Sequence, residues 1–412
     1  MNMLTFYKEE SFKETPIGNI PEDWEVVKLK SIAFEVKKGF ACGKRDENGI
    51  LQLRMDSIDP GGWINVNAGV RVPIPKNVDE YILHPGDILF NNTNSVDLIG
   101  KTAIFRGEFH KCVYSNHITR IRVNSDVVLP EWILYTFIRK WRLGFFKAIC
   151  HRHVHQAGIS DSDLLNIRIP LPPLEEQKAI VHILSTVDEA IQKTNEVIEK
   201  IKRLKKGLMQ ELLTKGIGHK EFKDTEIGRI PKEWKVMKLG EVMRFENGRR
   251  PKIVLKKGKI PIYGSGGPVG YTQEFMVNQE FIVIVSRVGI GSVGKVYLAR
   301  GAVWISDNAM YSKHYDSDQV YLPFIYYLLT FRRLERFILR SGAGSYAIIT
   351  QSLLHNIKIQ LPKVYEQRRI AEILLLIDKR LEVERKRKEK LERIKKALMD
   401  LLLTGKIRVK VS

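Results

Sequence analysis

A glycine-rich segment at residues 289–294 has the G-x-G-x-x-G spacing of a dinucleotide-binding loop. Such a loop binds a pyrophosphate only when a helix follows it, because the N-terminus of that helix meets the negative charge. Here residues 295–299 and Gly301 follow, and they predict the second strand of a β-hairpin. Gly294-Lys295 also resembles the end of a phosphate-binding loop, but Val296 stands where that loop needs Ser or Thr. We therefore expect a turn and no nucleotide site.

Three histidines, His151, His153 and His155, alternate with other residues and would share one face of a strand. Imidazoles at this spacing can bind a metal ion, but no fourth ligand is evident. The neighbouring Arg152 and Gln156 are typical of a polar surface loop. Three interpretations stay open: a metal site, a nucleic-acid contact that includes Arg152, and a solvated loop, of which the loop is preferred.

A third motif, Asp188-Glu189-Ala190-Ile191, resembles the metal-binding box of helicases. It lies inside a helical heptad pattern and not after an apolar strand, so we interpret it as coiled-coil surface. The tetrapeptides Asp-Pro-Pro-Tyr and Asn-Pro-Pro-Phe of amino-methyltransferases do not occur, and no ordered carboxylate–Lys set of a nuclease stands out. We expect no catalytic site and no metal site in this chain.

The composition favours a polyanionic partner. The chain has 412 residues, and 68 Lys and Arg against 47 Asp and Glu give it a formal charge of +21. An apolar fraction of 44% excludes a disordered chain. The three cysteines (Cys42, Cys112 and Cys150) are too widely spaced for a disulfide framework, and no apolar run reaches the ~20 residues of a membrane span. We expect a cytoplasmic protein that binds nucleic acid.

The sequence is duplicated. Residues 12–29 and 222–239 are identical at eleven of eighteen positions, at an offset of 210. A second match begins at Leu171-Pro172 and Leu361-Pro362, at an offset of 190, and extends through Glu176-Gln177 and its copy to the end of each half. Each half therefore consists of a head, a variable middle and a long polar–apolar segment.

Each long segment has a 4-3 apolar period. Ten frame positions from Ile180 to Leu212 hold eight apolar residues, and the frame shifted by 190 holds seven. This pattern predicts two helices of ~58 Å that pair as an antiparallel coiled coil. Lys205 and Lys395 share one frame position and would help to fix the register. The alternative is two separate amphipathic helices, each packed on its own domain.

The middle segments contain short β-type runs and helical stretches between turn residues, which predicts mixed α+β domains. The expected fold is thus two globular domains, each followed by a long helix, with internal pseudo-two-fold symmetry. The predicted segments are the heads 1–29 and 219–239, the middles 30–170 and 240–360, and the helices 171–218 and 361–412.

Polar and basic side chains near glycine-bearing turns are the candidates for DNA contacts, because Arg, Lys, Asn and Gln read base edges and phosphates. The first half offers Lys44, Arg45, Gln52, Arg54, Asn91, Asn92, Asn94 and Arg152. The second half offers Arg249, Arg250, Lys252, Tyr263, Ser265, Arg287, Lys313 and His314. A residue of this kind alone is more often a solvated surface residue than a base contact, so these residues are candidates as groups.

The heads Ile17–Trp24 and Ile227–Trp234, the Leu-Pro…Glu-Gln helix starts and the segment Tyr263–Gly267 resemble the specificity subunit of type I restriction–modification systems. The resemblance implies a non-catalytic subunit that reads a split, asymmetric DNA site through two target-recognition domains. It also implies assembly with two modification subunits, which use S-adenosylmethionine, and with restriction subunits, which use ATP and Mg²⁺. The second helix start departs from the pattern, with Lys363-Val364 in place of Pro173-Leu174.

Two other functions remain to be compared with this one. A coiled-coil adaptor that binds nucleic acid without reading its sequence would also be basic and duplicated. A self-sufficient methyltransferase is disfavoured, because the catalytic tetrapeptide is absent.

Overall fold

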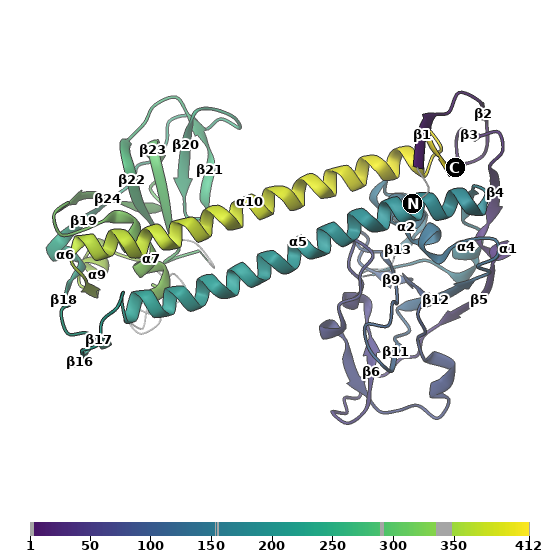
Figure 1. The fold of residues 1–412 in the computed structure, drawn as a ribbon, viewed down its shortest axis with the longest axis horizontal. Coiled ribbons are helices and arrows are strands. Elements are labelled where there is room, and N and C mark those ends of the chain that lie inside the picture. Colours follow the sequence, from purple (N-terminus) through teal and green to yellow (C-terminus); the bar gives the residue numbers. More distant parts are fainter. Residues whose placement is uncertain (1–3, 153, 155, 289–291, 335–347, 412) are drawn as a thin grey trace. The chain divides into compact units, whose positions relative to one another are not determined.

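The computed structural model describes residues 4–152, 154, 156–288, 292–334 and 348–411. They form two compact units: unit 1 comprises Met1–Lys193 and Lys388–Ser412, and unit 2 comprises Thr194–Arg387. Each unit therefore holds a head, a middle, the first part of the helix that follows and the last part of the other helix (Figure 1). Within the described ranges, no helix has both the length and the apolar content needed to cross a membrane.

Unit 1 combines the first head with a mixed α/β domain. Its head and first strands are β1 (Leu4–Lys8), β2 (Phe12–Lys13), β3 (Ile20–Pro21), β4 (Glu25–Lys28), α1 (Leu29–Ile32), β5 (Ala33–Lys38), β6 (Ile50–Leu53) and β7 (Val70–Val72). Then come β8 (Ile88–Asn91), β9 (Thr93–Asn94), β10 (Thr102–Ile104), β11 (Cys112–Tyr114), β12 (Ile118–Val123), α2 (Pro130–Arg142), α3 (Phe145–Ile149), β13 (His151–Arg152), β14 (Ala157–Gly158), α4 (Asp161–Leu165) and β15 (Arg168–Leu171). The sheets have the strand orders β10-β8-β12-β5, β11-β6-β7 and β13-β14-β9.

Helix α2 buries its apolar face against the four-stranded sheet. Phe90 from β8, Phe137 from α2 and Phe146 from α3 meet edge to face, with ring centroids 5.2–5.8 Å apart. Trp132 is fully buried, and its Nε1 donates to the Pro170 carbonyl at 2.8 Å. These contacts join the middle of unit 1 to the strand that leads into the long helix.

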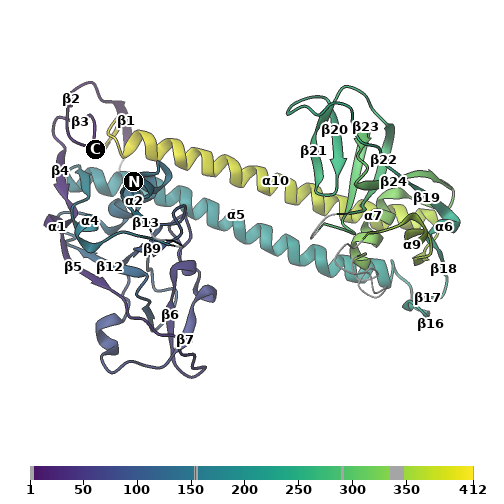
Figure 2. The same cartoon turned by 180° about the vertical axis from the view of Figure 1, so that it is seen from behind.

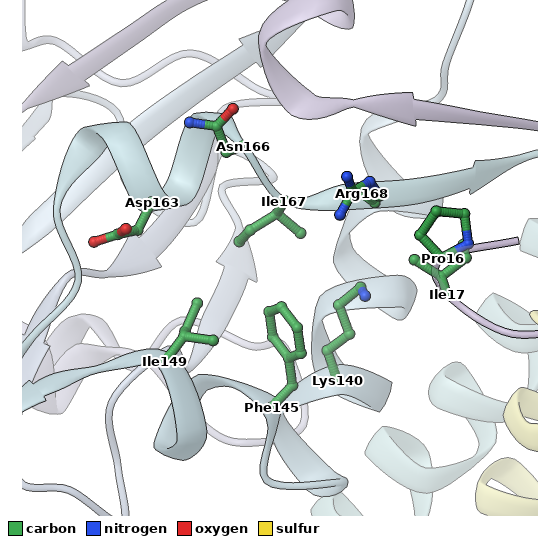
Figure 3. Close-up of a pocket in the computed structure, with 9 residues that line it drawn as sticks. All are labelled: Pro16, Ile17, Lys140, Phe145, Ile149, Asp163, Asn166, Ile167 and Arg168. Atoms are coloured by element: carbon green, nitrogen blue, oxygen red, sulfur yellow. The ribbon is translucent and has the colours of Figure 1, made fainter.

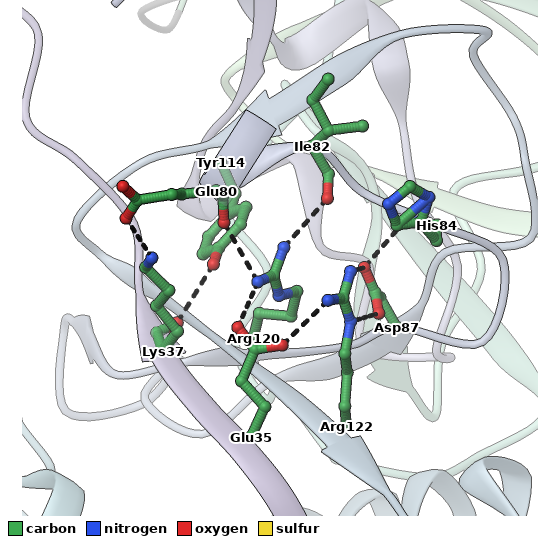
Figure 4. Close-up of polar contacts among 9 residues, drawn as sticks. All are labelled: Glu35, Lys37, Glu80, Ile82, His84, Asp87, Tyr114, Arg120 and Arg122. Carbon is green, nitrogen blue, oxygen red and sulfur yellow. Dashed lines mark hydrogen bonds and ion pairs between the residues drawn. The ribbon is translucent and has the colours of Figure 1, made fainter. Parts of the chain in front are cut away.

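A network of charged side chains stabilises the four-stranded sheet on β5, β8 and β12 (Figure 4). Arg120 is 2% exposed and donates to Glu35 Oε1 at 2.5 Å, while Arg122 donates to Glu35 Oε2 at 2.8 Å and to Asp87 Oδ1 at 2.6 Å. Burial by itself raises the pKa of Glu35, but the hydrogen bonds and charges of the two guanidinium groups outweigh it and hold that pKa below its usual value.

Unit 1 should therefore lose stability in acid through Glu35. Because its folded pKa lies below the unfolded value of about 4.3, its contribution is fully present above that pH. The contribution is lost as the pH falls through the folded pKa. We expect Glu35→Gln to unfold at lower urea concentration than the parent at pH 7, with the difference shrinking below pH ~4. The exposed Glu14→Gln is the control; equal shifts for both variants would contradict the assignment.

Unit 2 repeats this plan with a larger sheet. Its elements are β16 (Phe222–Thr225), β17 (Gly228–Pro231), β18 (Lys235–Lys238), α6 (Leu239–Val242), β19 (Met243–Asn247), β20 (Ile260–Gly264), β21 (Gly267–Thr272), β22 (Val277–Ser286), β23 (Val296–Ile305), β24 (Ala309–Tyr315), α7 (Leu322–Arg332), α9 (Gln351–His355) and β25 (Lys358–Leu361). The sheet order is β19-β24-β22-β23-β20-β21, and α7 packs against β22 and β23 (Figure 2). In both units the last head strand pairs with the strand before the long helix, as β4–β15 and β18–β25.

The G-x-G-x-x-G motif connects two antiparallel strands, as predicted. Strand β23 begins at Val296, directly after the motif, and pairs along β22. Residues 289–291 lie outside the described ranges, while Gly294 has a positive φ of 83°. A strand and not a helix therefore follows the motif, which does not match the requirement of a dinucleotide site.

The two long helices are α5 (Leu174–Thr214) and α10 (Val364–Leu402), and they run antiparallel within each unit. In unit 1, Asp188 of α5 pairs with Lys395 of α10 at 2.6 Å. In unit 2, Lys205 of α5 pairs with Asp378 of α10 at 2.5 Å. Both frame lysines therefore bind an aspartate of the opposite helix, and the predicted antiparallel pairing is confirmed.

The interpretation of Asp188 as coiled-coil surface is wrong. Its side chain is 6% exposed, and besides Lys395 it accepts a hydrogen bond from Tyr135 of α2 at 2.9 Å. Asp378 accepts the equivalent bond from Tyr327 of α7 at 2.7 Å. Asp188 is buried and Asp378 is 32% exposed at its side chain, and each joins the helix pair to the middle of its unit.

The Glu-Gln pair at each helix start binds the domain to the helix. Gln177 is fully buried: its Oε1 accepts from the Leu129 amide at 3.0 Å, and its Nε2 donates to the Val127 and Pro172 carbonyls. Glu176 accepts a bond from Trp24 Nε1 of the head at 3.0 Å.

Unit 2 makes the same bonds with the copied residues. Gln367 binds the Tyr321 amide and the Gln319 carbonyl, and Glu366 accepts from Trp234 Nε1 at 3.1 Å. The second helix begins at the position equivalent to the first despite its different starting residues.

Candidate nucleic-acid interface

In unit 1, a turn at residues 115–118 brings several of the predicted residues together; we call it hub turn 1. It follows β11, which runs parallel to β6 with Val113 opposite Gln52. Because parallel strands end at the same edge, the residues after both strands lie side by side. Four backbone bonds from other segments hold the turn. The Ser115 and Asn116 amides bind the Leu53 and Phe40 carbonyls, and the Gly39 and Asn92 amides bind carbonyls of the turn.

A pocket of about 320 Å³ opens beside hub turn 1, lined by the loop at residues 41–43, by Gln52 and Arg54, and by the turn itself. Gln52 Nε2 donates to the Phe40 carbonyl at 2.9 Å, and Arg54 Nη2 donates to the Cys42 carbonyl at 3.0 Å. Gln52 Oε1 and Arg54 Nε have no partner among the described atoms. Gln52 is 0% exposed, so its side chain is held inside the protein behind the pocket wall, whereas Arg54 is half-buried.

His117 also lines this pocket. Its partial burial lowers its pKa, and the positive charges of Lys38 and Arg54 lower it further. The ring is therefore neutral at pH 7 and offers one donor and one acceptor nitrogen. Such a ring can hydrogen-bond to a base edge without adding another charge.

Asn91 and Asn92 are not available for contacts with DNA, which corrects the sequence-based choice. Asn91 is 0% and Asn92 2% exposed. Their amide groups bind inside the protein, Asn91 Nδ2 to the Met55 carbonyl at 3.1 Å and Asn92 Nδ2 to Thr119 Oγ1 at 2.8 Å. Strand β8 has an apolar cluster on each face, so polar residues at its end are enclosed and stabilise the fold.

Asn94 and Arg152 lie on the two outer strands of the small sheet β13-β14-β9 in unit 1. Ala157 of β14 stands between them, opposite Asn94 on one side and opposite Arg152 on the other. Asn94 Nδ2 is buried without a partner among the described residues, while the Arg152 side chain is exposed.

The two remaining basic candidates, Lys44 and Arg45, are exposed in the loop before β6. The histidine cluster can be assessed only in part, because His153 and His155 lie outside the described residues. His151 is exposed, and its Nε2 lies 2.9 Å from Asp163 Oδ2. Within the described ranges, no group of three or more His, Cys, Asp or Glu side chains is placed to hold a metal ion.

Hub turn 2, at residues 306–309, is the equivalent turn of unit 2. The Ser306 amide donates to the Tyr263 carbonyl, and the Arg287 amide donates to the Asn308 carbonyl, both at 2.9 Å. The Arg249 amide binds the Ile305 carbonyl next to the turn, also at 2.9 Å. Three predicted residues from three different segments therefore meet at this turn.

Two glycines show that the hub turns are the same structure. A Cβ at Gly39 would lie 2.3–2.4 Å from the carbonyl oxygens of Tyr114 and Ser115. A Cβ at Gly248 would lie 2.2–2.4 Å from those of Ser306 and Ile305. Each glycine is required where the chain before the loop passes against the turn.

The other candidates of unit 2 differ in their relation to hub turn 2. Ser265 lies near Tyr263, and its carbonyl accepts from Tyr297 Oη at 3.0 Å. Arg250 and Lys252 are exposed after β19. Lys313 and His314 lie near the end of β24 that is far from hub turn 2, since His314 stands opposite Arg244 at the start of β19. Lys313 is bound to Glu246 at 2.8 Å.

A family model for the type I restriction modification DNA specificity domain matches residues 21–203 and again residues 231–393. The two matches cover most of the chain and coincide with the two head–middle–helix repeats. The chain belongs to the type I restriction–modification DNA specificity family.

Relatives within the specificity family match the chain over its whole length. The MjaX specificity subunit of Methanocaldococcus jannaschii, a type I restriction enzyme subunit by its name, is 37% identical over 99% of both chains. The MjaVIII specificity subunit of the same organism is 32% identical over 99% of this chain and 98% of its own. The crystal structure of a type I S subunit from M. genitalium matches 95% of this chain and 99% of its own with a TM-score of 0.65 and 18% identity, which shows a common fold.

Sequence reasoning missed Asn116 and His117 in hub turn 1 and Asn308 in hub turn 2. The signal was present: Ser115-Asn116-His117 and Ser306-Asp307-Asn308 are related by a constant offset of 191, and each follows a β-strand. Asn116 and His117 are half-buried and Asn308 is exposed, so each turn presents a polar side chain, and the two halves of this chain differ there.

Proposed function

We propose that this specificity-family chain reads a bipartite, asymmetric DNA site, with one half-site bound at hub turn 1 and the other at hub turn 2. One observation carries this proposal. The two turns have the same backbone connections, but different side chains surround them. Gln52, Arg54 and His117 line the pocket beside the first, whereas the main chains of Arg249 and Tyr263, residues of other types, bond at or next to the second. Equivalent frames with different donors and acceptors suit two unlike base sequences.

The paired helices serve as the spacer between the half-sites and as the docking surface for two modification subunits. Exposed apolar side chains support docking: Leu376 and Val383 in unit 2 are 66% and 49% exposed, and Ile394 and Leu401 in unit 1 are each 40% exposed. Within each pair the residues are seven apart, so they share one face of α10. An exposed apolar stripe of this kind is suited to a helix of a partner.

In this proposal the chain supplies recognition and no catalysis. The modification subunits bind S-adenosylmethionine and methylate the DNA, and restriction subunits, where they join the complex, use ATP and Mg²⁺. The complex acts on DNA in the cytoplasm. A net charge of +21 supports sequence-independent attraction to the DNA phosphates. Contacts with the base edges then add sequence specificity to this attraction.

Exchange of one domain tests the proposal. Residues 30–170 are replaced by the same region of a relative, and the methylated sites of host DNA are sequenced. We expect one half-site to change while the other half-site and the spacer stay the same. The reciprocal exchange of residues 240–360 is the matched control and should change only the other half-site.

Two results would contradict the proposal. A change in both half-sites after one exchange would show that the units do not read independently. Unchanged methylation after both exchanges, with DNA binding retained, would indicate an adaptor that does not read sequence.

His117 should contribute to recognition of one half-site only. Its neutral ring can form about one hydrogen bond to a base, so His117→Ala should reduce discrimination at one base pair by roughly five- to tenfold, the effect of about 1–1.4 kcal/mol. Competition binding with single-base variants of the site would measure it. The exposed His110, which does not line the pocket, provides the control His110→Ala. Equal loss at every position for His117→Ala would point to a phosphate contact instead.

A further inference from the structure

A second pocket of unit 1, of about 240 Å³, lies between the head and the end of α2 (Figure 3). Ile17, Phe145 and Ile167 supply much of its apolar wall. Two cationic residues, Lys140 and Arg168, also line it. In Figure 3 the Lys140 side chain extends from α2 toward Arg168. This pocket is separate from the one beside hub turn 1, with which it shares no lining residue.

Neither cationic side chain has a hydrogen-bond or ion-pair partner among the residues that the structure describes. The Lys140 amine lies 4.4 Å from the centre of the Phe145 ring, and burial lowers the pKa of Lys140 to about 8. Lys140 is half-buried, whereas Arg168 is exposed, so the Lys140 ammonium group is the one that gains most from a nearby anion.

The carboxylate of Asp163, which also lines the pocket, does not meet this need. Its Oδ2 accepts from Ser160 Oγ at 2.5 Å and lies 2.9 Å from His151 Nε2. Within the described part of unit 1, Asp163 therefore forms an ion pair with neither Lys140 nor Arg168.

Unit 2 supplies this negative charge from its own head. Lys358 corresponds to Arg168 at the offset of 190, and Glu226 corresponds to Pro16 at the offset of 210. The Glu226 carboxylate forms an ion pair with Lys358. The same local frame in the other half of the duplicated chain thus places a carboxylate beside this cation.

The second cation of unit 2, Arg332, also has a hydrogen-bond acceptor. Arg332 corresponds to Lys140 at an offset of 192. The same offset relates Tyr327 of α7 to Tyr135 of α2, and each of these tyrosines binds an aspartate of a long helix. Arg332 Nη2 donates to Gln360 Oε1, and Gln360 corresponds to Pro170. Pro16 and Pro170 thus stand in unit 1 where unit 2 has its two acceptors, Glu226 and Gln360. Lys140 and Arg168 therefore lack the corresponding acceptors.

We propose that the Lys140–Arg168 pocket binds the carboxylate of an acidic side chain presented by a partner polypeptide, at the place where unit 2 holds its own Glu226. The apolar wall accommodates the methylene groups of that side chain, and the two cations bind its carboxylate. Only the identity of the partner, a modification subunit, rests on the proposed function.

The first experiment uses the full chain without any partner. Its lysines are reductively methylated with ¹³C, and the Lys140 resonance is identified by its loss in Lys140→Arg. N-acetylglutamate α-amide is then titrated as the probe, with N-acetylglutamine α-amide as the uncharged control. We expect a saturable shift with the glutamate probe, at a Kd on the order of millimolar, and none with the glutamine probe.

Two substitutions at residue 16 provide a matched pair of variants. Pro16→Glu copies the unit 2 arrangement and should abolish the shift, because its own carboxylate then occupies the pocket. Pro16→Gln has the same length without the charge and should retain the shift. A response that is equal for both probes, or unaffected by Pro16→Glu, would overturn the proposal.

The second experiment uses the chain assembled with its modification subunits. A carbodiimide joins a carboxylate to an amine in direct contact, and mass spectrometry identifies the linked residues. We expect Lys140 to be linked to an Asp or Glu of the modification subunit, and Pro16→Glu to abolish this link. If Lys140 remains unlinked and as reactive to an acylating reagent as in the free chain, the proposed occupant is wrong.

Two further outcomes separate this proposal from the proposed function. Protection of Lys140 by DNA alone, with inorganic phosphate displacing the glutamate probe at lower concentration, would assign the pocket to the DNA backbone and overturn the inference. Failure of the subunits to assemble would count against the proposed function, while the titration of the free chain would still decide whether the pocket recognises a carboxylate.

Discussion

Replacing Lys395 with Met should lower the free energy of unfolding by about 3–5 kcal/mol, the usual effect of removing one partner of a buried ion pair. Lys395 and Asp188 are 10% and 6% exposed at their side chains and lie 2.6 Å apart. Without the ammonium group, the Asp188 carboxylate keeps the hydrogen bond from Tyr135 but loses its counter-charge. Urea unfolding would give the change, and hydrogen exchange would locate it in unit 1.

Two variants make this result specific. Lys390 is exposed on the same helix, so Lys390→Met should change stability by less than about 0.5 kcal/mol. The double variant Asp188→Leu/Lys395→Met removes both charges and should recover much of the loss, because an apolar pair can replace a buried ion pair. A loss below about 1 kcal/mol for Lys395→Met would mean that the pair is not important for stability.

The second large effect is expected at Arg408 on the last strand, β26 (Ile407–Val411), which pairs with β1. Arg408 donates to both oxygens of Glu176 at 3.0 and 2.6 Å, to Asp23 at 2.6 and 2.7 Å, and to Glu9 at 2.9 Å. Arg408→Gln leaves the buried Glu176 carboxylate without its cation. We expect a loss of about 3–5 kcal/mol.

Hydrogen exchange of β1 and β26 would report this loss directly. Their amides should exchange much faster in Arg408→Gln, while those of unit 2 should not change. Lys410→Gln removes an exposed cation from the same strand and should leave exchange as in the parent. Unchanged protection in Arg408→Gln would show that strand pairing alone holds the two strands together.

The duplication, the helices and their register could be predicted from the sequence because they depend on local, periodic signals. The 4-3 apolar period predicted the pair of long helices. The shared frame position of Lys205 and Lys395 identified two residues that bind an aspartate of the opposite helix and so help to set the register of the pair. The Leu-Pro…Glu-Gln starts also marked both helix beginnings correctly, since a proline followed by an acidic first turn is a local signal.

The candidate interface was harder to predict because it depends on contacts between distant segments. Hub turn 1 exists only because β6 and β11 pair in parallel, across about sixty residues of intervening chain. Asn91 and Asn92 have the residue type of a base-reading side chain, and only the packing on both faces of β8 shows that they are enclosed. Asp188 was misread for the same reason, because its partners Tyr135 and Lys395 come from other parts of the chain.

The bonds of Gln177 and Gln367 have a consequence for how such a protein can change over time. Each glutamine holds its domain through main-chain amide and carbonyl groups, such as the Leu129 amide and the Val127 carbonyl in unit 1. Main-chain groups are the same for every residue type except proline, whose amide hydrogen is missing. These bonds therefore do not depend on the residue types of the domain at these positions, whereas the bond from Tyr135 to Asp188 does depend on a side chain. Substitutions at these positions of the domain can accumulate without loss of the attachment that the glutamines provide.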